Sequence, residues 1–117
     1  MAQQKVEIEV VDAGAYTVLR PAGDLDVYTV RSLRDALAKL IEDSVSRVVV
    51  DLDGVRFMDS SGLGSLMGGV RRVREAGGDV AIACTVDHHL KLIGIVDRAD
   101  EVAIESSVEE AAKALAK

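Results

Sequence analysis

Residues 47–73 read RVVVDLDGVRFMDSSGLGSLMGGVRRV and contain the two patterns that decide the fold. Residues 47–52 are short, mostly apolar and β-branched, which predicts an interior strand covered on both faces. Residues 53–59 are expected to connect this strand to a helix. The apolar stripe of that helix recurs at helical spacing, at Leu63, Leu66, Met67, Val70 and Val73. The pair Gly77-Gly78 ends the helical pattern.

The residues before this stretch predict a hairpin and another helix. Residues 6–20 contain alternating apolar and acidic side chains and a central turn signal, which is typical of an opening β-hairpin. Pro21 is expected to end its second strand, because proline has no N–H to donate to a ladder. Residues 27–42 have the spacing of an amphipathic helix, and Asp24 or Asp26 can cap its N-terminus.

The residues after this stretch continue the alternation of strands and helices. Residues 80–84 predict a strand and residues 85–93 a helix, with a short strand following at 102–104. Ser107 and Glu110 have the spacing of a capping box, which opens a final alanine-rich helix.

The predicted order is therefore β-β-α-β-α-β-α-β-α, which indicates the α/β class. We expect one domain over residues 1–117, with a mixed, mostly parallel sheet of about five strands and about four packed helices. Apolar residues make up 49% of the 117 residues, which is enough for a buried core.

The composition counts against several classes of partner. Lys and Arg total 14 and Asp and Glu total 20, so the net charge is −6. Nucleic acid and anionic lipid need clustered cations, so neither is expected as a partner. No run of residues resembles a signal peptide or a membrane span, and we expect a cytoplasmic protein.

The sequence lacks the common signatures of an enzyme. Neither a Gly-x-Ser-x-Gly elbow nor a phosphate loop occurs, and Met67 occupies the last glycine position of a dinucleotide fingerprint. His88 and His89 point about 100° apart on a helix, so they are expected to be solvated rather than metal ligands. Cys84, the one cysteine, is expected to be a small buried hydrophobe. We therefore expect no catalytic residue and no metal.

Two serines at the predicted helix start are the candidate site. Ser60 and Ser61 lie where first-turn N–H groups are unpaired and accept anions. A second junction, residues 23–26, would form with them a flat, acidic surface without a pocket if the parent strands are neighbours, which suits a protein partner. The alternative is purely structural: Asp59 or Ser60 is only an N-cap, and the glycines only let the helix pack closely.

Three stretches, GDLDVY at 23–28, VVVDL at 48–52 and FMDSSGLG at 57–64, resemble the bacterial anti-sigma factor antagonists, the founding members of the STAS domain family. The resemblance extends over nearly the whole chain. It departs at residues 95–100, which read IVDRAD where the family usually has a Thr- or Ser-Gly-Leu turn.

The resemblance implies a fold of packed helices on a mixed sheet and a function in transcription. Family members bind an anti-sigma factor that is also a serine kinase, and binding frees the sigma factor. The kinase phosphorylates the serine after the aspartate and so breaks the complex, and a PP2C-type phosphatase restores it. ATP is used by the partner kinase, so this chain would need no cofactor.

Carried over to this chain, the resemblance makes Ser60 the phosphoacceptor, oriented by Asp59 and flanked by Ser61 and Gly62. The implied partner-binding residues are Gly23, Asp24, Leu25, Asp26, Asp59, Ser60, Gly62, Leu63 and Gly64. Two other functions stay open: a STAS subunit of a lipid-transport or stress-sensing complex without a phosphoswitch, and a small enzyme or nucleotide-binding protein that uses Asp59 and the serines.

Overall fold

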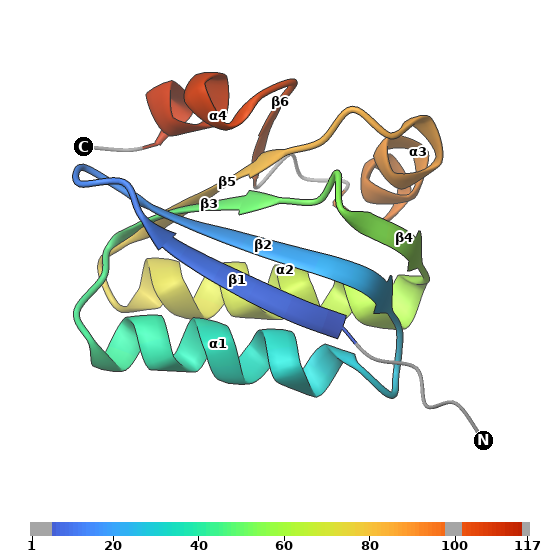
Figure 1. Ribbon diagram of the computed structural model, residues 1–117, viewed down its shortest axis with the longest axis horizontal. Coiled ribbons are helices and arrows are strands. Elements are labelled where there is room, and N and C mark those ends of the chain that lie inside the picture. The colour runs from blue at the N-terminus through green and yellow to red at the C-terminus, as the bar shows by residue number, and fades with distance from the viewer. Residues whose placement is uncertain (1–5, 98–101, 116–117) are drawn as a thin grey trace.

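The computed structural model describes residues 6–97 and 102–115, and in these it forms a mixed six-stranded sheet with four helices (Figure 1). The α/β class and the alternation of elements are confirmed, with one strand more than predicted. In chain order the elements are β1 (Val6–Asp12), β2 (Thr17–Leu25), α1 (Val30–Glu42), β3 (Arg47–Asp51), β4 (Val55–Met58), α2 (Ser60–Glu75), β5 (Asp79–Ala83), α3 (Asp87–Val96), β6 (Ala103–Glu105) and α4 (Val108–Ala114).

The long strand β2 is shared by two parallel neighbours. The sheet order is β1-β2-β3-β5-β6, with β1 antiparallel to β2 and the other pairs parallel. The first part of β2 pairs with β3, and residues 23–25 pair with β4. The carboxyl ends of β2 and β4 therefore lie side by side.

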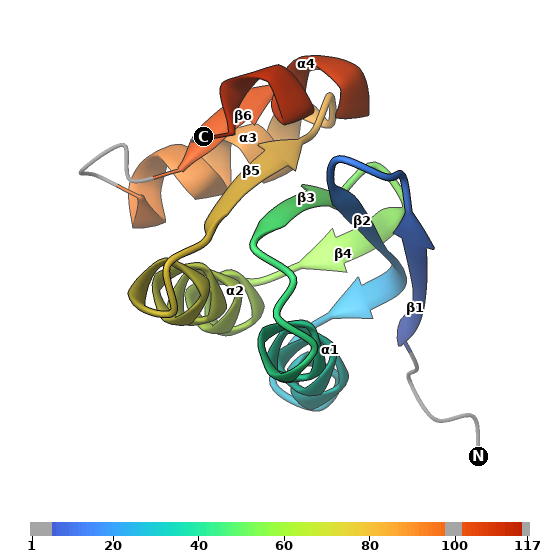
Figure 2. The ribbon, with the colours of Figure 1, turned by 90° about the vertical axis from the view of Figure 1, so that its left-hand side faces the viewer.

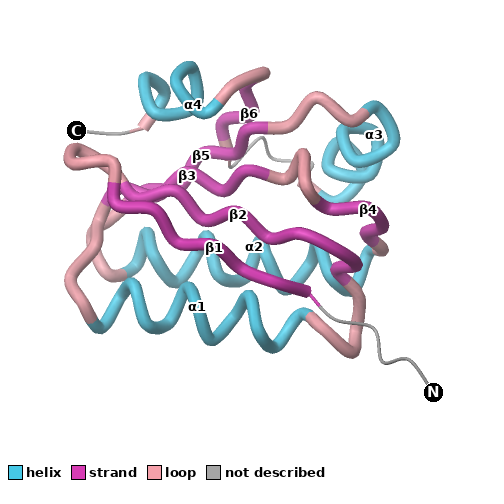
Figure 3. Tube along the Cα trace, viewed as in Figure 1, coloured by secondary structure: helices cyan, strands magenta, loops and turns pink. Residues whose placement is uncertain are grey.

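Helices cover the sheet on both faces. α1 and α2 lie next to each other under one face, whereas α4 packs on β3 and β5 from the other side (Figures 2 and 3). Val48 and Val50 pack in the core with α1 and α2, and Val49 packs beneath α4. All three side chains are fully buried, which confirms the predicted interior strand. None of the helices in residues 6–97 and 102–115 is long and apolar enough to cross a bilayer.

Pro21 does not end β2, so that prediction is wrong. The strand runs on to Leu25, and Pro21 pairs with Ile8 of β1. The N–H of Gly23 donates to the carbonyl of Gly54. The backbone nitrogens of residues two apart in a strand face the same neighbouring strand, so the nitrogen of Pro21 faces the same side as that of Gly23. The missing N–H of Pro21 therefore faces the gap between the end of β3 and the start of β4, where no ladder bond is needed.

The predicted connection 53–59 contains the strand β4. Its register on β2 shifts by one residue: Gly23 pairs with Val55, but Asp24 pairs with Phe57. Arg56 is the extra residue. Because of this shift, Arg56 and Phe57 are both exposed while Val55 and Met58 are buried. The sequence therefore shows no alternation from which a strand could have been predicted.

Of the four glycines of α2, one packs against backbone, one against a side chain and two face open space. A Cβ at Gly62 would overlap the carbonyl oxygen of Leu25, and a Cβ at Gly69 would meet the side chain of Leu37. By contrast, nothing lies within 4 Å of a Cβ built at Gly64 or Gly68. Close packing thus explains Gly62 and Gly69, and Gly62 sets how near α2 lies to the end of β2.

We expect Gly62→Ala to destabilise the fold and Gly68→Ala to stabilise it. The carbonyl of Leu25, which faces Gly62, belongs to the backbone and cannot move aside. Such overpacking costs about 1–3 kcal/mol. Gly68→Ala instead gains up to about 1 kcal/mol of helix propensity in open space. Urea denaturation of both variants measures the difference, and equal free energies of unfolding would contradict the packing role of Gly62.

Candidate functional site

Ser60 is the first residue of α2 and is exposed. Asp59 precedes it as the N-cap in extended backbone, and its Oδ1 accepts a hydrogen bond from the N–H of Gly62 at 2.8 Å. The cap pairs one first-turn amide and holds the helix start in place. Ser60 is thus exposed at the positive end of a helix.

The two strand-to-helix junctions of the sequence analysis adjoin in the structure. Leu25 pairs with Met58 at the ends of β2 and β4, and the N–H of Asp59 donates to the carbonyl of Leu25 at 3.3 Å. Residues 23–26 therefore lie directly beside the start of α2.

The second junction is held by its own hydrogen bonds. Asp26 Oδ1 accepts from the N–H groups of Tyr28 and Thr29, and the Thr29 hydroxyl donates to the carbonyl of Asp24 at 2.6 Å. Thr29 is the N-cap, so α1 begins at Val30 rather than at residue 27. The prediction that Asp24 or Asp26 caps this helix is therefore wrong. Asp26 forms an Asx turn instead, and this turn fixes the loop in front of the helix.

The predicted acidic surface is weaker than expected, because Asp24 is not free in solvent. Asp24 is only 7% exposed, and its Oδ1 accepts a hydrogen bond from Arg56 Nε at 3.0 Å and forms an ion pair with Nη2 at 2.9 Å. The guanidinium lies outside, since the Arg56 side chain is 75% exposed. The negative charge at this position is therefore neutralised by a cation that the sequence analysis did not select.

Two predicted partner-binding residues cannot meet a partner through their side chains. Leu25 and Leu63 are fully buried in the core, where they anchor β2 and α2. Gly62 is buried against the backbone of Leu25. The predicted residues that are exposed or partly exposed are Gly23, Asp26, Asp59, Ser60, Ser61 and Gly64.

Three exposed apolar side chains at the same edge were missed. Val27 is 62% exposed, Tyr28 is 85% exposed and Phe57 is 51% exposed. Tyr28 lies off the apolar stripe of the predicted helix, and from that position its exposure could have been predicted. The exposure of Val27 and Phe57 follows from the late start of α1 and the register shift in β4, and the sequence pattern indicates neither.

Two residues with reactive side chains belong to the interior. His89 was expected to be solvated, but it is fully buried, and its Nε2 lies 2.7 Å from the carbonyl oxygen of Val55, which holds α3 against β4. Cys84 is buried as expected, and desolvation raises the pKa of its thiol above the ordinary value. Within residues 6–97 and 102–115, no three His, Cys, Asp or Glu side chains gather as metal ligands.

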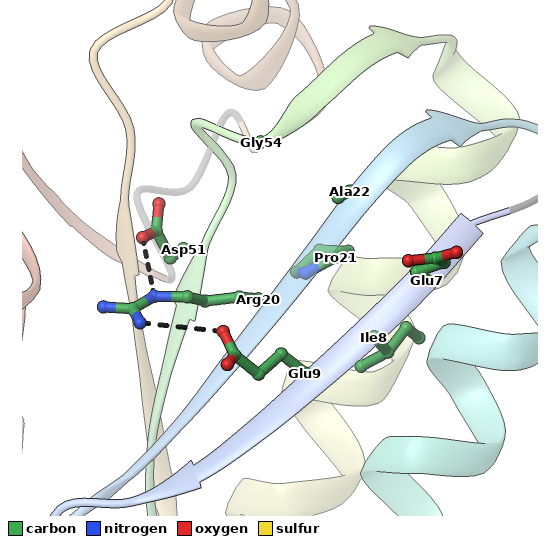
Figure 4. A pocket seen from close by; sticks show the side chains of 8 residues that line it. All are labelled: Glu7, Ile8, Glu9, Arg20, Pro21, Ala22, Asp51 and Gly54. Carbon is green, nitrogen blue, oxygen red and sulfur yellow. Dashed lines mark hydrogen bonds and ion pairs between the residues drawn. The ribbon is translucent and has the colours of Figure 1, made fainter.

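A hollow of about 570 Å³ lies over the outer face of β1 and β2, which α4 leaves uncovered (Figure 4). Arg20 crosses it and pairs with Glu9 at 3.7 Å and Asp51 at 3.3 Å. Most of the charged groups that line the hollow pair with one another, and Ser60 does not line it. The lining residues are Glu7, Ile8, Glu9, Arg20, Pro21, Ala22, Asp51 and Gly54.

Comparison with known proteins identifies relatives over most of the chain. Residues 5–111 match the family model of the STAS domain. The anti-sigma-B factor antagonist of Staphylococcus aureus is 29% identical over 93 residues, which is 80% of this chain and 77% of that protein. The protein of the same name from Staphylococcus epidermidis is 28% identical over 93 residues, with the same coverage.

Solved structures share the fold. An anti-sigma factor antagonist from Mycobacterium paratuberculosis superposes with a TM-score of 0.84 at 21% identity, covering 94% of this chain and 93% of that chain. SpoIIAA in its unphosphorylated form has a TM-score of 0.73 at 21% identity, covering 90% of this chain and 92% of that one. The phosphorylated form of SpoIIAA from Bacillus has a TM-score of 0.69 at 21% identity, covering 92% and 97%.

Removing the cap at Asp59 should loosen the start of α2. We expect Asp59→Ala to lower the free energy of unfolding by about 0.5–2 kcal/mol, because the N–H of Gly62 loses its acceptor. Asp59→Asn keeps an acceptor oxygen and should retain most of the stability. Chemical denaturation checks this, and an asparagine variant as unstable as the alanine variant would contradict the capping role.

Proposed function

The chain belongs to the STAS domain family, and from this premise we propose that it is an anti-sigma factor antagonist. In its unphosphorylated form it binds an anti-sigma factor that is also a serine kinase, and this releases the sigma factor. The observation that carries the proposal is the exposed Ser60 at the N-terminus of α2, beside exposed apolar side chains. The relatives named anti-sigma-B factor antagonists support it.

The partner docks on the edge of the sheet where β2 and β4 end. We name as the docking surface the side chains of Val27, Tyr28, Phe57 and Ser60. Three of them are apolar and exposed, so they offer a partner apolar area to bury. Aromatic side chains commonly contribute most of the binding energy at protein interfaces. This surface therefore fits a protein better than a small substrate.

Phosphorylation of Ser60 switches docking off by adding charge. A phosphoserine carries about −1.5 to −2 charges at neutral pH. Docking would then bury a dianion beside the carboxylates of Asp59 and Asp26, and unpaired buried charge is costly. A loss of about 2.7 kcal/mol weakens binding a hundredfold. Asp24 adds little to this repulsion, because Arg56 neutralises it.

The kinase binds the ATP and catalyses the transfer, so this chain acts as a substrate and a binding module, without a cofactor or a catalytic residue of its own. A PP2C-type phosphatase removes the phosphate and restores docking. The helix N-terminus tolerates either state, because its unpaired amides and dipole stabilise an anion. It is consistent with this that both forms of SpoIIAA share the present fold.

Ser60 should be the residue that is modified. We expect Ser60→Ala to abolish phosphorylation by the anti-sigma factor kinase and to retain docking, because it keeps a small neutral side chain. Ser61→Ala, the matched control, should still be phosphorylated. Phosphosite mass spectrometry after incubation with the kinase and ATP decides this, and phosphate on Ser61 in the Ser60→Ala variant would contradict it.

Phosphorylation should leave the fold intact. An anion at a helix N-terminus gains about 0.3–1 kcal/mol, which corresponds to a rise in Tm of at most about 8 °C for a domain of this size. Thermal melts of the phosphorylated and unmodified chains measure the shift. A Tm that falls by more than about 10 °C on phosphorylation would show that the switch acts by unfolding.

A further inference from the structure

The register shift in β4 exposes two neighbouring side chains of different chemistry. A regular strand on a covered sheet points alternate residues to opposite faces. Here Arg56 is inserted between Val55, which pairs with Gly23, and Phe57, which pairs with Asp24. An extra residue in a strand re-aims the side chains near it. The result is an exposed cation and an exposed aromatic ring at consecutive positions, separated from Asp59 and Ser60 only by the buried Met58.

The buried carboxylate of Asp24 holds the Arg56 guanidinium in place. Asp24 is 7% exposed, and its Oδ1 accepts a hydrogen bond from Arg56 Nε at 3.0 Å and pairs with Nη2 at 2.9 Å. A surface arginine ordinarily loses rotamer freedom when it binds, and an arginine already fixed by a carboxylate loses less. The 75% exposed side chain keeps donors directed to solvent.

From this arrangement we propose that Arg56 is a specificity-determining contact at the margin of the docking surface, next to Phe57. It pairs with a carboxylate of the partner, while Phe57 packs against an apolar side chain beside that carboxylate. The inference rests on the proposed function and specifies the chemistry of the partner. The partner segment carries an aspartate or glutamate beside an apolar residue.

The charge of the chain makes this contact selective. With a net charge of −6, the chain as a whole repels a carboxylate. An acidic side chain on the partner is therefore favoured opposite a fixed cation, and Arg56 sets the register in which the partner docks. The planar guanidinium binds a carboxylate through two parallel hydrogen bonds, which a lysine cannot reproduce.

The experiment compares variants in the phosphorylation of Ser60 by the anti-sigma factor kinase. Arg56→Ala alone would leave the buried Asp24 carboxylate without its cation and could destabilise the fold. We therefore compare the double variant Asp24→Asn/Arg56→Ala with Asp24→Asn, in which the guanidinium remains. Arg34→Ala removes the same charge from the exposed surface of α1 and serves as the matched control.

We expect the double variant to have a KM about tenfold higher than Asp24→Asn at low salt, with kcat unchanged, as for the loss of one interface contact. Asp24→Asn/Arg56→Lys should recover part of this loss. The difference should shrink as salt is raised, because exposed charges are screened. Arg34→Ala should match the wild-type chain.

A KM for the double variant within twofold of Asp24→Asn, with Ser60 still phosphorylated in both, would overturn the role of Arg56 and leave the proposed function intact. If the kinase instead neither bound nor phosphorylated the wild-type chain, the proposed function itself would fail, and the assignment of Arg56 with it. Thermal melts of each variant separate these outcomes from loss of fold.

Discussion

The carbonyl of Leu25 is the point on which the functional edge of this protein depends. It accepts the N–H of Asp59, and the backbone of α2 passes so close to it that only glycine fits at position 62. These contacts join the end of β2, the end of β4 and the start of α2. Because Leu25 and Leu63 are buried on either side of the contact, the core holds it rigidly. The exposed serine at the helix start therefore lies two residues from this close contact.

A rigid edge suits a switch that works by charge. The hydrogen bonds of the Asp59 cap and of the Asx turn of Asp26 form within the chain, so this edge is ordered without a partner. A phosphate on Ser60 would change the potential at this edge with little change in shape. In the proposed function, docking then depends on what the partner must bury: neutral apolar side chains in one state, a dianion in the other.

Much of the fold was predictable from sequence, because local patterns determined it. Three consecutive buried valines marked β3, the apolar stripe marked α2, and Ser107 does accept the N–H of Glu110 at 3.1 Å as the capping box requires. Contacts between distant segments were not predictable. The charge of Asp24 is neutralised by Arg56, which lies 32 residues later in the sequence. His89 is buried, and its Nε2 bonds to the carbonyl of Val55 in β4. Strand β4 was missed because its register shift removes the alternation by which strands are recognised.

The dissociation constant of the complex with the anti-sigma factor, measured by calorimetry for the chain in its unmodified form and with phosphate on Ser60, tests the central claim most directly. The account predicts that the phosphate weakens binding about a hundredfold, which is about 2.7 kcal/mol. It also predicts that the phosphorylated and unmodified chains are equally folded, so that unfolding does not cause the weaker binding. Equal dissociation constants for the two forms would contradict the claim that charge at this helix start controls docking.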